Sequence, residues 1–239
     1  VVPMTALDNE ARIRGVSVYL PDRAIPMLPH ALSSGICSLN PEEDRLAMVV
    51  RVDIDAMGRR HDAKFCAAVI RSHARLDYPG VAAALAGDFR GPRARYQRWI
   101  AELGQLARVA ALLRKQRSQG GALEIDLPEA VVVLDDDDPL RVRDVKRSRA
   151  TPEEKGAYQM IEEFMLAANL SVAEFFARKK SDCIWRVHDA PAHERLEVFA
   201  DLAQSFGVHV DADELAAPAG MQLAIAELEG KPYARAMHF

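Results

Sequence analysis

Apolar residues recur at helical spacing along two long segments of the chain. In the first segment they are Trp99, Ile100, Leu103, Leu106, Ala107, Val109, Leu112 and Leu113. This period is typical of an amphipathic helix. We predict a helix over Pro92–Gln119, because proline suits a first turn and the following Gly120–Gly121 pair would end it. A second long helix is predicted over Pro152–Arg178, which also begins with proline.

Shorter helices are predicted around these two. Their ranges are Asp8–Arg14, Pro79–Ala86, Pro191–Phe206 and Asp213–Glu229. Asp8 is a candidate N-cap of the first helix, and glycines follow the other three as stop signals. Pro218 lies inside the last range, so that helix either kinks there or begins there. Pro29–Ser34 predicts one further helical turn.

Alternating and β-branched residues predict strands between the helices. Arg45–Ile54 and Arg59–Arg71 are expected to form one hairpin around the turn residues Asp55–Gly58. Further strands are predicted over Ala122–Asp126, Ala130–Leu134, Leu140–Val145 and Cys183–Val187. The middle two would pair across Asp135–Pro139. The fold class is therefore predicted as α+β, with a meandering antiparallel sheet flanked by long helices.

Composition limits the classes of protein that fit this pattern. The chain has 239 residues, of which 49% are hydrophobic, so it can form the core of one large domain. The net charge of −4 means that any RNA-binding residues must gather in a groove rather than cover the surface. The three cysteines (Cys37, Cys66 and Cys183) lie far apart without a CxxC motif. They disfavour a disulfide framework and a cysteine zinc site, and they favour a reducing cytoplasm. No apolar run reaches the roughly 20 residues that cross a bilayer, so we expect no membrane partner.

The most specific sequence lies between Arg14 and Asn40, where three prolines stand among apolar residues together with Tyr19 and Cys37. Because proline removes a backbone donor and fixes φ, we predict an extended segment laid over a core rather than a regular helix or strand. A second segment, Ala157–Asn169, reads AYQMIEEFMLAAN within the second long helix. In this order and at this separation, the two segments closely resemble the catalytic (RNB) domain of the ribonuclease II and ribonuclease R exoribonucleases.

The resemblance implies that residues 1–239 are the central part of such a catalytic domain, and we expect both ends to continue in a longer polypeptide. The parent protein would be a processive 3′–5′ exoribonuclease that needs Mg²⁺ and hydrolyses single-stranded RNA to nucleoside 5′-monophosphates. It would act as a cytoplasmic monomer, with oligonucleotide-binding-fold domains flanking this region. The family's metal-binding aspartates and phosphate-binding arginine would lie outside the chain, so no catalytic or metal-binding residue is expected within it.

Two other classes of function stay open at this point. One is a non-catalytic RNA-binding module on the same fold, and the other is a structural or interaction domain in which the tyrosines are buried. The segments that flank this chain in its parent would discriminate between them. An aspartate-rich segment upstream and a Ser-Pro-Ile-Arg-Arg segment downstream would indicate an enzyme.

The resemblance assigns Tyr19 and Ile125 to the two walls of a slot that holds the last bases of the RNA 3′ end. Tyrosine suits this role because every base has a π-face on which an aromatic ring can stack. Ile125 departs from the family, which has phenylalanine at this position, because isoleucine offers no π-surface. From the residues alone, Tyr19 also fits a core tyrosine on an edge strand.

The resemblance assigns Tyr78 and Glu162 to contacts with the sugars near the RNA 3′ end, where they would favour RNA over DNA. The 2′-hydroxyl is both donor and acceptor, a carboxylate accepts, and a phenol does either. Tyr78 also fits a packing residue at a helix start, and Glu162 fits a solvated helix acid. The apolar neighbours of Glu162 and Glu163 indicate that at least one of the two acids faces inward, and we assign the sugar contact to Glu162.

Four consecutive aspartates, Asp135–Asp138, are the remaining candidates for metal binding. Consecutive side chains of an extended chain point to opposite faces, so they do not converge on one ion. Because the run also lies between two predicted strands and before a proline, we predict a solvated hairpin turn.

Overall fold

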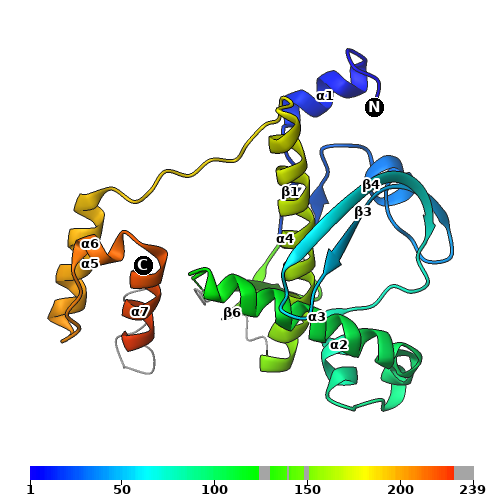
Figure 1. The fold of residues 1–239 in the computed structure, drawn as a ribbon. Coiled ribbons are helices and arrows are strands. Elements are labelled where there is room, and N and C mark those ends of the chain that lie inside the picture. Colours follow the sequence, from blue (N-terminus) through cyan, green and yellow to red (C-terminus); the bar gives the residue numbers. More distant parts are fainter. Residues whose placement is uncertain (124–129, 139, 148–150, 229–239) are drawn as a thin grey trace. The chain divides into compact units, whose positions relative to one another are not determined.

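The computed structural model describes residues 1–123, 130–138, 140–147 and 151–228. The chain forms two compact units. The first contains Val1–Arg51, Lys64–Arg98 and Pro128–Lys155, and the second contains Val52–Ala63, Trp99–Leu127 and Gly156–Phe239. Helices alternate with antiparallel strand pairs along the chain (Figure 1). The predicted α+β class is confirmed, although the strands of the described residues form three separate two-stranded sheets instead of one meander.

The first unit begins with helix α1, Ala6–Arg14. Its N-cap is Thr5, whose hydroxyl accepts a hydrogen bond from the Asp8 amide, so the prediction that Asp8 caps this helix was wrong. Asp8 instead accepts from the Met4 amide at 2.9 Å, which satisfies a second amide at the helix start. The proline-rich segment that follows forms the very short strands β1 (Val18–Tyr19) and β2 (Ala24–Ile25) and one turn of π-helix, η1 (Ala31–Ile36).

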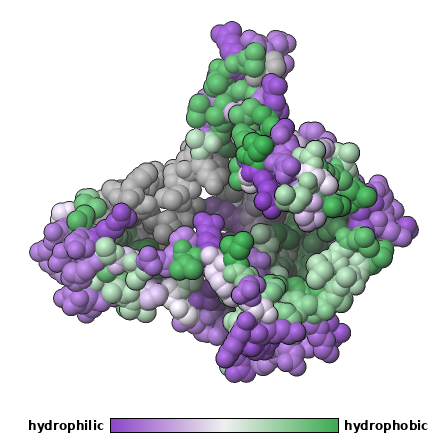
Figure 2. Space-filling model, turned by 90° about the horizontal axis from the view of Figure 1, so that it is seen from above, coloured by the Kyte–Doolittle hydropathy of each residue, from purple (hydrophilic) through white to green (hydrophobic). Residues whose placement is uncertain are grey.

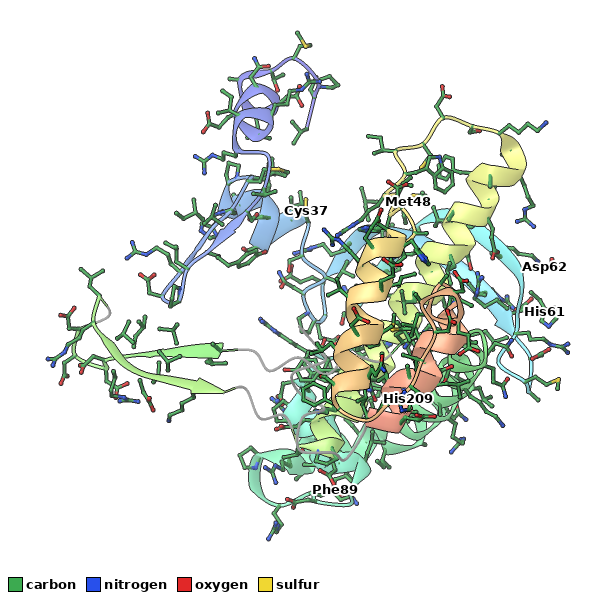
Figure 3. The ribbon with its side chains drawn as sticks, turned by 90° about the vertical axis from the view of Figure 1, so that its left-hand side faces the viewer. Cys37, Met48, His61, Asp62, Phe89 and His209 are labelled. Atoms are coloured by element: carbon green, nitrogen blue, oxygen red, sulfur yellow. The ribbon has the colours of Figure 1, made fainter. Side chains whose placement is uncertain are left out.

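Strands β3 (Asp44–Ile54) and β4 (Arg60–Arg71) form the predicted hairpin, whose tip belongs to the second unit. At the turn, Asp55 Oδ1 accepts hydrogen bonds from the amides of Met57 (2.8 Å) and Arg59 (3.0 Å). His61, whose side chain is labelled in Figure 3, places Nε2 3.0 Å from Asp55 Oδ2. This hydrogen bond and those from Arg59 hold the pKa of the Asp55 carboxyl well below its usual value. The tip is therefore organised around one aspartate.

Exposed apolar side chains mark one face of this hairpin. Leu46 is 87% exposed, Met48 is 79% exposed and Val69 is 64% exposed. Figure 3 labels Met48. Figure 2 shows one face of the whole molecule, on which apolar residues are interspersed with polar ones. These side chains do not contribute to the core of the described chain.

Helix α2 (Tyr78–Leu85) is short, as predicted, and its residues Val81, Ala82 and Ala84 are buried. The predicted helix over Pro92–Gln119 was wrong in its first third. Residues Gly91–Trp99 form a 3₁₀ helix, η2, and the α-helix α3 covers only Ile100–Gln119. The difference has a tertiary cause, because Tyr96 in the 3₁₀ segment is only 2% exposed and bonds to the cap of α2.

Strands β5 (Ala130–Leu134) and β6 (Val142–Arg147) pair in antiparallel fashion, with Val132 opposite Val145. The pairing across the aspartate run is confirmed. The predicted strand Ala122–Asp126 lies largely outside the described residues. Cys183–Val187 is irregular chain, so the strand predicted there was wrong.

Helix α4 (Pro152–Lys179) is the longest element of the described chain. Its buried positions form one stripe along the helix at Ala157, Met160, Glu163, Ala167 and Ser171. The spacing of three or four residues is that of one helical face. An acid therefore stands in the middle of an otherwise uncharged face.

Three further helices complete the second unit: α5 (His193–Ser205), α6 (Ala212–Leu215) and α7 (Pro218–Leu228). The helix predicted over Asp213–Glu229 is divided in two. Helix α7 begins at Pro218, which is one of the two alternatives that the sequence predicted. Two small clusters of buried residues hold these helices together, one around Ala203, Val208 and Leu228 and the other around Leu196, Leu215 and Ala224.

Candidate functional site

The predicted site residues are distributed over the two units. Tyr19 on β1 and Tyr78 on α2 belong to the first unit, and Glu162 on α4 belongs to the second. Ile125 lies outside the described residues, so its place opposite Tyr19 stays a prediction.

Tyr19 lies on a small, well-anchored ribbon. It pairs with Ala24 across the β1–β2 turn, which is closed by a hydrogen bond from the Leu20 amide to the Arg23 carbonyl. The far side of the ribbon is held by the Met27 amide, which donates to the Ser17 hydroxyl at 3.1 Å. The side chain of Tyr19 is 81% exposed. Tyr19 is therefore not a core residue of this chain, and its ring is accessible for stacking.

Tyr78 is the first residue of α2, and three neighbours fix that helix start. Asp77 is the N-cap, and its Oδ1 accepts from the Gly80 amide at 2.7 Å. The hydroxyl of the buried Tyr96 donates to Asp77 Oδ2 at 2.5 Å, and Arg95 Nη2 lies 2.9 Å from the same oxygen. Gly80 leaves the space that Tyr96 fills, because a Cβ there would lie 2.2 Å from the phenol oxygen. The half-buried Tyr78 thus follows a rigid cap.

These contacts also determine the ionisation of the cap. The Tyr96 hydroxyl lowers the pKa of the Asp77 carboxyl below its usual value, and the Gly80 amide and Arg95 act in the same direction. Donors to a carboxylate favour its charged form. Asp77 is therefore an anion at neutral pH, and its negative charge interacts favourably with the positive end of the helix dipole.

The two adjacent glutamates of α4 differ sharply in environment. Glu163 is only 3% exposed and accepts from Arg117 of α3, with Nη2–Oε1 at 2.6 Å and Nε–Oε1 at 3.1 Å. Glu162 keeps 54% of its side chain exposed and lies 3.8 Å from the same Nη2. The prediction that one acid faces inward is confirmed, and it is Glu163. Glu162 is the acid that remains accessible to a ligand, although its contact with a sugar stays a prediction.

Sequence reasoning missed Arg117, Asp77 and Tyr96. A signal for Arg117 was present, because Glu163 falls on the stripe of Ala157, Met160 and Ala167, and a buried acid requires a cation. Nothing in the local sequence indicated that Tyr96 would reach Asp77, since the two lie 19 residues apart.

Asp135–Asp138 form the turn between β5 and β6, as predicted. Asp135 Oδ1 accepts from the amides of Asp137 (3.0 Å) and Asp138 (3.3 Å), and Asp136 pairs with Arg143. In the described part of the chain, no group of three or more His, Cys, Asp or Glu residues is placed to hold a metal ion. No described helix is long and apolar enough to cross a membrane.

One pocket of about 260 Å³ opens in the second unit, next to His209 (Figure 3). It is lined by Gln204, Val210 and Asp211 as well. Of the predicted site residues that the structure describes, Tyr19, Tyr78 and Glu162 do not line it.

Residues 1–238 match the RNB domain family. Ribonuclease R of Escherichia coli (strain K12) is 38% identical over 210 residues, which are 88% of this chain and 25% of that protein. Ribonuclease R of Aquifex aeolicus (strain VF5) is 32% identical over 236 residues, which are 98% of this chain and 32% of that protein. The chain thus spans between a quarter and a third of the length of these two relatives.

Solved structures share the fold at lower identity. Mycoplasma genitalium RNase R in complex with ribose methylated single-stranded RNA superposes with a TM-score of 0.87 at 24% identity, covering 100% of this chain and 36% of the other. Yeast Ssd1, described as a pseudonuclease, superposes with a TM-score of 0.70 at 17% identity, covering 100% of this chain and 27% of the other. One fold therefore occurs both in a ribonuclease and in a pseudonuclease.

Proposed function

The chain belongs to the RNB domain family, and from that premise we propose that its parent protein is an exoribonuclease in which this chain holds the RNA. The observation that carries the proposal is the 38% identity to E. coli ribonuclease R over 210 residues. The finer activity that we propose is processive, magnesium-dependent hydrolysis of single-stranded RNA from its 3′ end to nucleoside 5′-monophosphates. Residues 1–239 are then one part of the catalytic domain of a longer parent.

The proposed roles of the site residues come from the family resemblance, and the exposure and chemistry of Tyr19 and Glu162 are compatible with them. Tyr19, 81% exposed on its anchored ribbon, offers a ring on which a terminal base stacks whatever its identity. Tyr78 and the exposed Glu162 are assigned to the sugars, where a carboxylate accepts a hydrogen bond from a 2′-hydroxyl. Ile125 is assigned to the second wall of the base slot. Holding the chain end in one geometry lowers the barrier to its hydrolysis, because the reacting groups need not find one another.

Mg²⁺ takes oxygen ligands, usually one or two carboxylates with water and substrate phosphates. Among the residues that the structure describes, no three or more His, Cys, Asp or Glu side chains are grouped so that they could hold a metal ion. Asp135 and Asp138 accept from backbone amides of their own turn. We propose that the magnesium ligands and the cation that faces the scissile phosphate are supplied by other parts of the parent.

A non-catalytic RNA-binding module is the second candidate. The likeness to yeast Ssd1, a pseudonuclease, favours keeping it. In that case Tyr19 and Glu162 would hold RNA without any cleavage. Both candidates take single-stranded RNA as partner, and for both we propose oligonucleotide-binding-fold domains beside this region, a monomeric parent and a cytoplasmic location. The three cysteines are free and exposed, as suits a reducing compartment.

The deciding experiment uses the full-length parent and a single-stranded RNA labelled at its 5′ end, with magnesium and with a chelator. The expected result is magnesium-dependent loss of full-length RNA to a short labelled end product, with few intermediates, because a processive enzyme does not release its substrate. RNA that stays intact while it binds the protein would favour the non-catalytic module. Cleavage at internal positions would contradict both candidates.

The isolated chain of residues 1–239 provides a second test. It should release no mononucleotides from the same RNA in magnesium, because we propose that other parts of the parent supply the magnesium ligands. Robust magnesium-dependent release by this chain would refute our placement of the metal ligands and would return Asp135–Asp138 to consideration.

A further inference from the structure

Two contacts, one helical turn apart, connect α3 to α4. Arg114 Nη1 donates to Gln159 Oε1 at 2.5 Å, and Arg117 donates to Glu163 through both Nε and Nη2. The residues are three apart on α3 and four apart on α4, so each pair lies on one face of its helix. Figure 1 shows helix α3 crossing helix α4.

The Arg117 contact is one of the contacts that fix how α4 is rotated about its axis, and it lies next to Glu162. A planar guanidinium that donates through two nitrogens binds a carboxylate in one plane and from one direction. Glu163 is only 3% exposed, so its carboxylate has little access to water and depends on Arg117, which is itself 28% exposed. Since successive helix residues point about 100° apart, a fixed Glu163 also fixes the direction of Glu162.

Arg117 acts on Glu162 directly as well. Its Nη2 lies 3.8 Å from Glu162 Oε1 while it bonds to Glu163 at 2.6 Å. One cation thus faces two neighbouring carboxylates that would repel each other without it. Glu162 remains 54% exposed, so this attraction orients the acid without covering it.

From this geometry we infer that Arg117 is a positioning residue, which holds Glu162 in the orientation in which it accepts a hydrogen bond from the RNA 2′-hydroxyl. The inference rests on the proposed function, since it concerns the sugar contact of Glu162. It adds a residue from α3 to the determinants of RNA over DNA, and that residue itself touches neither base nor sugar.

The test uses the full-length parent with matched RNA and DNA oligomers of one sequence, and it measures the RNA-to-DNA ratio of kcat/KM and of equilibrium affinity. Arg117→Lys keeps the charge but cannot donate through two nitrogens in one plane. We expect it to lower the ratio at least fivefold through weaker action on RNA, with DNA little changed. Glu162→Gln should lower the ratio by a similar factor, and the double variant should be no lower than Glu162→Gln alone.

Arg114→Lys is the matched control, because it disturbs the neighbouring contact on the same helix and should leave the ratio unchanged. If Arg117→Lys does not fold, Arg117→Gln combined with Glu163→Gln replaces it. That pair leaves no uncompensated buried charge while Glu162 still loses its cation, and the ratio should again fall.

The outcomes separate the inference from the proposed function. A lower thermal midpoint with an unchanged ratio in Arg117→Lys, while Glu162→Gln does lower the ratio, would overturn the inference and make Arg117 purely structural. An unchanged ratio in Glu162→Gln would remove the sugar contact itself and the inference with it. A parent that binds RNA without degrading it refutes the proposed exoribonuclease, yet a fall in its affinity ratio in Arg117→Lys would still support the inference.

Discussion

Gly58, at the tip of the β3–β4 hairpin, is expected to tolerate no side chain. Its φ is +80°, a left-handed conformation that costs other residues about 1–2 kcal/mol. A Cβ at this position would also lie 2.3 Å from the carbonyl oxygen of Leu112 and 2.6 Å from its carbonyl carbon. Both atoms belong to the backbone of α3, so no flexible side chain can move aside. The hairpin tip would have to lift away from the helix.

The magnitude of the effect is the sum of these two contributions. Overpacking of a tight contact costs about 1–3 kcal/mol, so Gly58→Ala should lower the free energy of unfolding by about 2–5 kcal/mol with the left-handed backbone included. Gly207 supplies the control within the same unit. Its φ is +78°, and nothing lies within 4 Å of its added Cβ. Gly207→Ala should therefore cost only the backbone contribution, about 1–2 kcal/mol.

Denaturant unfolding of residues 1–239, followed by circular dichroism, measures both variants against the parent sequence. The prediction is that Gly58→Ala is less stable than Gly207→Ala by about 1–3 kcal/mol, which is the cost of the contact with Leu112. Equal losses in the two variants would show that the hairpin tip does not press on α3 in solution, and the reasoning would fail.

Three further changes have expected outcomes. Tyr19→Ala in the full-length parent should weaken binding of short single-stranded RNA about tenfold to hundredfold, which is the value of one lost base stack. The thermal midpoint should change little because the ring is 81% exposed, whereas normal binding with a much lower midpoint would make Tyr19 a core residue. Glu163→Ala should destabilise residues 1–239 by about 1.5–3 kcal/mol, because the hydrogen bonds between Arg117 and a buried carboxylate are lost, whereas Glu162→Ala should cost under about 1 kcal/mol. Equal losses in denaturant unfolding would contradict the difference in burial. Because the pKa of Asp77 is lowered in the folded state, its contribution to stability is complete above the unfolded pKa of about 3.9 and is lost as pH falls through the lower folded pKa. Asp77→Asn should therefore flatten the pH dependence of the free energy of unfolding in this acidic range, and an unaltered dependence would contradict the role of Asp77 as an ionised N-cap.

Much of the fold could be predicted because the relevant signals are local. Prolines mark the starts of α4 and α7, and glycines follow α3 and α5. Helical spacing of apolar residues identified the long helices, and alternating or β-branched residues identified strands of the β3–β4 and β5–β6 pairs. The family was predicted from the Arg14–Asn40 and Ala157–Asn169 segments, and the match over residues 1–238 confirms it.

One error occurs where a long-range contact joins a segment to another element. The 3₁₀ segment Gly91–Trp99 has a helical pattern, but it winds differently because Tyr96 bonds to Asp77, 19 residues away. Cys183–Val187 has strand composition and remains irregular. Helical spacing places Glu163 on the buried stripe of α4, but its partner, Arg117 of α3, could not be identified from the sequence, because the two residues lie 46 apart.

The buried acid of α4 also has a consequence for folding specificity. The rest of its buried stripe consists of Ala157, Met160, Ala167 and Ser171, which are mostly small side chains that select poorly among alternative alignments. A slip of α4 by one turn, about 5.4 Å along its axis, would bring other residues to the positions that these side chains now occupy. The slip would, however, leave Glu163 buried without Arg117, and a buried charge without its partner is among the most unfavourable arrangements in a protein. The pair therefore acts against misaligned states more than it adds to the stability of the correct one.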